Sequence, residues 1–74
     1  MVMRQLMGAE AVTELIIERW TNLNQSTDYR WSVWVDGRRV QMGGPHKTAD
    51  ESEQEGQAYC QKSLARKPDR VTRL

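Results

Sequence analysis

A chain of 74 residues is long enough for one small domain, and its 38% hydrophobic content is modest, so we expect marginal stability. One cysteine and one histidine exclude an internal disulfide and a four-ligand zinc site within one chain. A net charge of +1 implies no particular class of partner by itself. No signal peptide or run of about 20 apolar residues is present, so we expect a cytoplasmic protein with no membrane contact.

Apolar residues recur at helical spacing from about Gly8 to Leu23, which predicts an amphipathic first helix. The apolar arc of this helix would consist of Val12, Leu15, Ile16, Trp20 and Leu23. Ile17 lies outside the arc. With Trp20 it forms a candidate edge for a homodimer, or else it is a scattered surface aliphatic residue. Asn, Ser, Thr and Asp dominate residues 22–28 and predict the loop that ends the helix.

A β-hairpin is predicted over Tyr29–Met42 because Asp36-Gly37 separates two alternating runs of residues. A type I′ turn at this pair requires φ > 0 at both central positions. Counting outward from the turn predicts these cross-strand pairs: Val35 with Arg38, Trp34 with Arg39, Val33 with Val40, Ser32 with Gln41, and Trp31 with Met42. One face would then be core, and the opposite face would carry Arg30, Trp34 and Arg39.

The stretch Gly43-Gly44-Pro45-His46 predicts a turn between strand and helix, and it matches no phosphate-binding pattern. Thr48 and Glu51 have the spacing of a capping box, so a second helix should begin there and end before Pro68. Its buried stripe would be Ala49, Ser52, Gly56, Cys60, Ser63 and Leu64, with Gly56 leaving room for Trp31. Residues 69–74 are either a third strand or a frayed tail.

The predicted fold class is therefore α+β, with the element order α-β-β-α-β. A small, mostly antiparallel three-stranded sheet, made of the hairpin and the C-terminal strand, would be packed with two helices. Residues 1–74 would form a single domain, with residues 1–7 either part of it or disordered.

Three hypotheses for function follow from the outer face of the sheet. The first is a nucleic-acid-binding accessory domain in which cations surround a stacking ring, using Arg30, Trp34, Arg38, Arg39, Arg70 and Arg73. The second is a protein-interaction or inhibitor module anchored by Trp34. In the third, the first helix or another subunit covers Trp34, and the face is structural. No nucleophile with its base, metal cluster or cofactor loop is evident, so we expect no enzyme, cofactor or metal.

Overall fold

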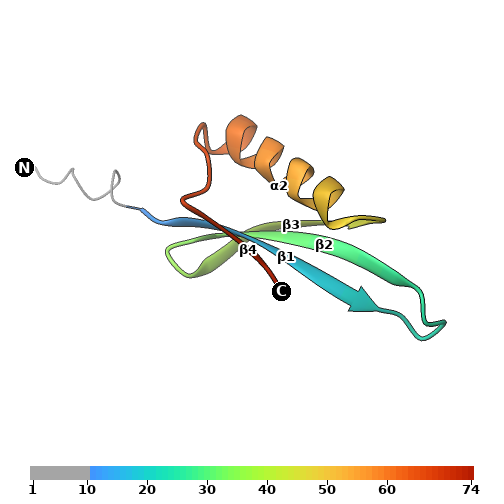
Figure 1. The fold of residues 1–74 in the computed structure, drawn as a ribbon. Helices are drawn as coiled ribbons and strands as arrows, with labels where there is room; N and C mark the ends of the chain where they lie inside the picture. The colour runs from blue at the N-terminus through green and yellow to red at the C-terminus, as the bar shows by residue number, and fades with distance from the viewer. Residues whose placement is uncertain (1–10) are drawn as a thin grey trace, which may run out of the picture.

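The computed structural model describes residues 11–74, which form a four-stranded mixed sheet and one helix. In chain order the elements are β1 (Thr13–Thr21), β2 (Thr27–Val35), β3 (Arg38–His46), α2 (Ala49–Ser63) and β4 (Arg70–Arg73). The strands lie in the order β3-β2-β1-β4, with β1 and β4 parallel and the other pairs antiparallel. Helix α2 packs on one face of this sheet (Figure 1).

The prediction of a first helix was wrong for the described residues, because Thr13–Thr21 form strand β1. Thr13, Leu15 and Ile17 are buried and alternate with more exposed neighbours, which is the two-residue period of a strand. Four of the nine residues are β-branched, and such residues favour a pleated strand over a helix. Ile17 is buried in the core, so it cannot form the predicted dimer edge with Trp20. Residues 8–10 of that predicted helix, and the expectation for residues 1–7, lie outside the described part of the chain.

The hairpin at Asp36-Gly37 is confirmed and is longer than predicted. Asp36 has φ 51° and Gly37 has φ 81°, as a type I′ turn requires. The two pairs next to the turn are as predicted, but the register then slips between Val33 and Trp34. Gln41, Met42 and Gly43 therefore face Val33, Ser32 and Trp31, and the three predicted pairs farther from the turn were wrong. The predicted turn at residues 43–46 was also wrong, because those residues continue β3.

Gly37→Val should destabilise the protein because the left-handed backbone at φ 81° disfavours a β-branched side chain. No atom lies within 4 Å of the position of an added Cβ, so the penalty is conformational and not steric. We expect a loss of about 1–2 kcal/mol and a melting temperature lower by roughly 5–15 °C. Gly37→Asn, which tolerates this conformation better, is the matched control. A valine variant that melts with the parent would contradict the turn assignment.

Helix α2 begins at Ala49, directly after its N-cap residue Thr48, as the capping box predicted. The Thr48 Oγ1 accepts a hydrogen bond from the Glu51 N–H at 3.1 Å, whereas the Glu51 carboxylate accepts from the Lys47 N–H and not from Thr48. Ser52, Gly56 and Cys60 are the buried positions of the helix, as expected, but Ser63 is exposed. A Cβ at Gly56 would lie 2.4 Å from Leu15 Cδ1. Gly56 therefore lets the helix backbone approach Leu15, and the prediction that it leaves room for Trp31 was wrong.

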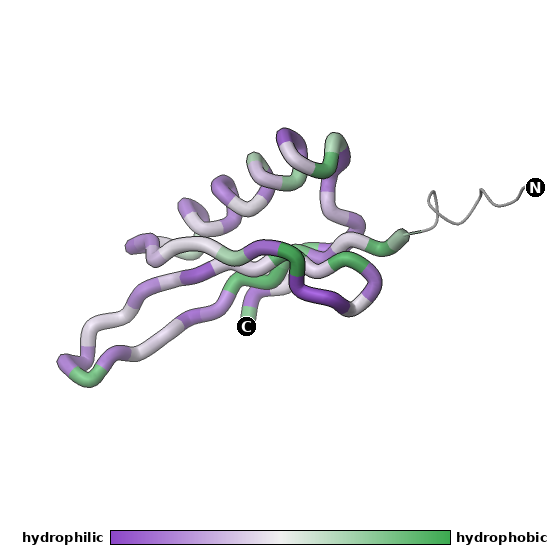
Figure 2. The backbone as a smooth tube through the Cα atoms, turned by 180° about the vertical axis from the view of Figure 1, so that it is seen from behind, coloured by the Kyte–Doolittle hydropathy of each residue, from purple (hydrophilic) through white to green (hydrophobic). Residues whose placement is uncertain are grey.

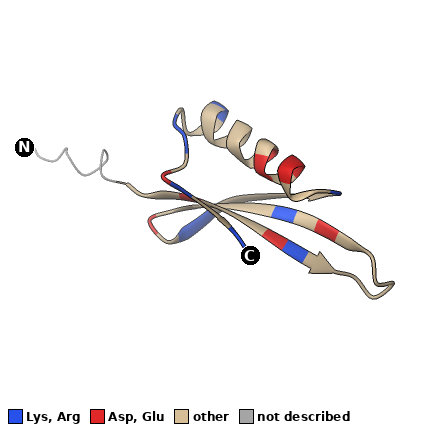
Figure 3. Ribbon diagram, in the orientation of Figure 1, with Lys and Arg blue, Asp and Glu red and all other residues tan. Residues whose placement is uncertain are grey.

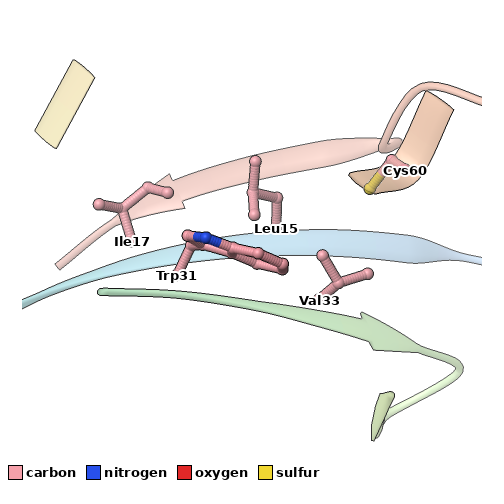
Figure 4. Close-up of a cluster of buried hydrophobic side chains, with 5 residues drawn as sticks. All are labelled: Leu15, Ile17, Trp31, Val33 and Cys60. Atoms are coloured by element: carbon pink, nitrogen blue, oxygen red, sulfur yellow. The ribbon is translucent and has the colours of Figure 1, made fainter. Parts of the chain in front are cut away.

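The core lies between α2 and the strands beneath it. Leu15 and Ile17 from β1, Trp31 and Val33 from β2, and Cys60 from α2 form this cluster (Figure 4). Figure 2 shows that hydrophobic residues are concentrated in the middle of the sheet, whereas many residues of the helix are hydrophilic. The one helix of the described residues is too short and too polar to span a membrane.

The C-terminal strand is confirmed as Arg70–Arg73, and it pairs with β1. The α+β class therefore holds, while the three-stranded sheet, the two helices and the order α-β-β-α-β are corrected to β-β-β-α-β for residues 11–74. Parallel pairing with β4 gives β1 a neighbouring strand on each side, and α2 covers its Leu15 and Ile17 side chains.

Candidate functional site

The sheet face opposite α2, termed the open face, is covered by no element of residues 11–74 (Figure 1). Strand alternation and register assign side chains to this face. They are Glu14, Ile16, Glu18 and Trp20 from β1, Asp28, Arg30, Ser32 and Trp34 from β2, Arg39 and Met42 from β3, and Arg70 and Thr72 from β4.

On the open face, the Trp34 indole is hydrogen-bonded to its own strand. Its Nε1–H donates to Ser32 Oγ at 2.8 Å, and Ser32 is two residues earlier on the same strand and the same face. The indole therefore extends back along β2. Ser32 is only 8% exposed although no described element covers it, as expected if neighbouring side chains such as this ring lie over it. Trp34 itself is half-buried, so a ring lying in this way can offer a π-face to solvent.

A cross-strand row places one arginine beside this indole and a second arginine two strands away. The register aligns Arg39 with Trp34, Trp34 with Glu14, and Glu14 with Arg70. Neighbouring strands are about 4.8 Å apart, so Arg39 is directly adjacent to Trp34 and Arg70 lies two strands away on the other side. Within residues 11–74, neither guanidinium makes an ion pair or a side-chain hydrogen bond. The row thus combines an aromatic ring with two uncommitted cations.

The carboxylates near this row are already bonded to groups of the chain itself. Glu14 accepts from the Thr72 hydroxyl at 3.0 Å, and Asp36 accepts from the Val12 N–H at 2.8 Å. Asp69 accepts from the Thr13 N–H at 2.7 Å and pairs with Arg66, and these contacts lower the pKa of Asp69. None of these acids forms an ion pair with Arg39 or Arg70.

The β1–β2 hairpin extends beyond α2 as an arm, defined as residues 18–30 (Figure 1). On its open face the Arg30 guanidinium lies 4.7 Å above the centre of the Trp20 ring and also pairs with Asp28. Figure 3 shows that the arm carries charges of both signs. Sequence reasoning missed Trp20 as a site residue because it was placed on a helix; the alternation of Glu18 and Trp20 with Ile17 and Arg19 was the available signal.

The predicted site residues fall into three groups. Trp34, Arg39 and Arg70 share one row, and Arg30 shares the face at the arm. Arg38 pairs with Val35 beside the turn, so it is exposed at the end of the sheet but belongs to the opposite face. Arg73 also faces α2: it binds Asp50 and Glu53 at 2.7 and 2.9 Å, and these bonds raise its pKa. Arg73 therefore does not share the open face with Trp34, Arg39 and Arg70.

The histidine and the cysteine are both engaged in the fold. His46 Nε2 lies 2.8 Å from Glu55 Oε1, and the same oxygen accepts from Trp31 Nε1 at 2.7 Å. These two hydrogen bonds lower the pKa of Glu55. Cys60 is buried, and desolvation raises the pKa of its thiol. Among residues 11–74 no three His, Cys, Asp or Glu side chains are grouped as metal ligands would be.

No family model, curated protein or solved structure matches the chain significantly. Its function is therefore inferred from the arrangement of its own residues.

Proposed function

We propose that this protein is a small, non-enzymatic module that binds single-stranded nucleic acid through the open face of its sheet. The supporting observation is the row in which the indole of Trp34, bonded back to Ser32, lies beside Arg39, with Arg70 two strands away. A base can stack on the indole while adjacent phosphates contact the arginines, which is how open sheets commonly hold single strands. Arg38 is exposed at the same end of the sheet but on the opposite face, so it could contact a phosphate only where the strand passes the Asp36-Gly37 turn.

Stacking should contribute more to this binding than charge. The open face carries three arginines, Arg30, Arg39 and Arg70, against three acids, Glu14, Glu18 and Asp28, so its charges balance. Each phosphate contact on a single strand contributes a slope of about −0.7 to the dependence of log affinity on log salt concentration. Two or three contacts therefore predict a total slope of only about −1.4 to −2.1.

Substitutions should separate the two contributions in titrations with a ten-nucleotide oligodeoxythymidylate, dT10. Trp34→Ala should weaken binding at every salt concentration, by about 5- to 150-fold for a stacking loss of 1–3 kcal/mol, and should leave the slope unchanged. Arg39→Ala should reduce the magnitude of the slope by about 0.7. Arg19→Ala is the matched control, because Arg19 is an exposed arginine on the opposite face of the sheet.

Glu14→Gln provides a test in the opposite direction. Glutamine can still accept the Thr72 hydroxyl hydrogen bond but removes a negative charge from the row of Trp34. Affinity for dT10 should rise at low salt, and the gain should shrink as salt screens the charge. Unchanged or weaker binding would show that phosphates do not pass this row.

A protein partner is the second candidate, and the aliphatic side chains of Ile16 and Met42 beside Trp34 favour it. An apolar centre within a charged rim is typical of protein interfaces. Failure of the parent protein to bind dT10, an RNA strand or a DNA duplex at low salt would contradict the nucleic-acid proposal and leave this one.

A further inference from the structure

The two tryptophans of the open face have the same local geometry. Trp34 donates its Nε1–H to Ser32, and Trp20 donates its Nε1–H to Glu18 at 3.1 Å, in each case to the residue two positions earlier on the same strand. Both indoles therefore extend along their own strands on the same face. Trp20 is 44% exposed, and the Arg30 guanidinium lies against its ring. Aromatic rings and guanidinium planes are the two side-chain surfaces on which bases stack.

The separation of the two indoles suits one continuous strand. Trp20 pairs with Asp28, which is six residues from Trp34 along β2. Six residues span about 20 Å at roughly 3.3 Å per residue. This is the distance between the two backbone positions; because β1 and β2 are antiparallel, the two indoles extend toward each other and their rings are closer than this. At about 3.4 Å per stacked nucleotide, a strand of roughly six nucleotides is therefore more than long enough to contact both rings.

The surface between the two indoles offers little resistance to such a strand. The row next to Trp34 is uncharged and consists of Met42, Ser32, Ile16 and Thr72. Farther along, Glu18 is bonded to the Trp20 indole, and Asp28 is paired with Arg30. The acids of the arm are thus partly neutralised or bonded within the arm itself.

We propose that Trp20 with Arg30 is a second stacking position, so that one single strand lies along β2 from Trp34 to the arm. The inference rests on the proposed function and adds the path of the ligand. Strands long enough to contact both positions gain by effective concentration, whereas a trinucleotide contacts only one. A duplex keeps its bases paired and cannot use either ring.

The test uses the full chain with dT3 and dT10 and follows the indole N–H resonances of the tryptophans by NMR, assigned from Trp→Phe variants. We expect dT3 to shift mainly the Trp34 signal and dT10 to shift both the Trp34 and Trp20 signals. Trp31, which is 5% exposed, is the internal control, and its indole N–H resonance should not shift. Affinity for dT10 should exceed that for dT3 by about 100-fold, well beyond the roughly eightfold gain from its eight overlapping registers.

Trp20→Ala should weaken dT10 binding by tenfold or more and leave dT3 binding within about twofold. Trp20→Phe retains a ring and should restore most of the dT10 affinity. If dT10 shifts only Trp34 and Trp20→Ala binds like the parent, the second position is disproved while the proposed function stands. If neither oligonucleotide shifts Trp34, the proposed function fails, and this inference fails with it.

Discussion

Replacing Gly56 with leucine is expected to destabilise the protein more than any other single substitution proposed for it. A Cβ at this position would lie 2.4 Å from Leu15 Cδ1, 3.2 Å from Cδ2 and 3.3 Å from Cγ. Leu15 is fully buried in the core cluster, so its side chain can move only by displacing its packed neighbours. A leucine must therefore lift α2 from the sheet and expose the core shared by Leu15 and Cys60.

We expect a loss of about 3 kcal/mol or more, even after the gain of about 1 kcal/mol from replacing glycine within a helix. The melting temperature should fall by roughly 12–24 °C, as measured by circular dichroism. Ala58→Leu is the matched control, because Ala58 is exposed on the same helix and should change stability by less than about 0.5 kcal/mol. A Gly56→Leu variant as stable as its parent would show that the helix face is assigned incorrectly.

The second large effect is expected for Gly43→Ala. An added Cβ would lie 2.6–2.7 Å from three atoms of the Trp31 indole: Cζ2, Cε2 and Nε1. That ring cannot easily turn away, because Nε1 donates to Glu55 at 2.7 Å and Tyr59 packs against it at a centroid distance of 5.7 Å. One methyl group should therefore displace either β3 or the ring, at a cost of about 2–3 kcal/mol in chemical denaturation.

A double-mutant cycle tests the cause of this loss. Trp31→Leu removes the aromatic ring that the new methyl group would strike. Gly43→Ala should therefore cost less than about 1 kcal/mol in that background, giving a coupling energy of roughly 1–2 kcal/mol. Equal losses in the two backgrounds would show that the alanine acts through something other than contact with Trp31.

Local signals predicted the elements that local chemistry determines. The turn at Asp36-Gly37 was predictable because only a few residue types accept positive φ at two consecutive positions. The start of α2 was predictable because Thr48 and Glu51 have the spacing of a helix cap. For β1, consecutive aliphatic residues at Leu15, Ile16 and Ile17 satisfied both a helical and a strand period, and the helical one was chosen.

The candidate site was predictable only in part, for a related reason. The pairing of Trp34 with Arg39 followed from counting outward from the turn. The row that adds Arg70 depends on parallel pairing between β1 and β4, for which adjacent residues give no signal. The same pairing sets the alternation along β4 and directs Arg73 toward the acids of α2. The extra residue near Val40 that shifts the hairpin register is likewise not encoded by a recognisable pattern.

The position of β4 beside β1 has a consequence for the order of folding. Glu14 and Thr72 are bonded across 58 positions of sequence, and Thr13 and Asp69 across 56. The ribosome synthesises β1 before β4, so the backbone N–H and C=O groups on one edge of β1 have no strand partner until β4 has been made. Such long-range pairing slows folding, and an unpaired strand edge is a template for aggregation. Yield in cells should therefore depend on chaperone supply and growth temperature more steeply than the size of the protein suggests.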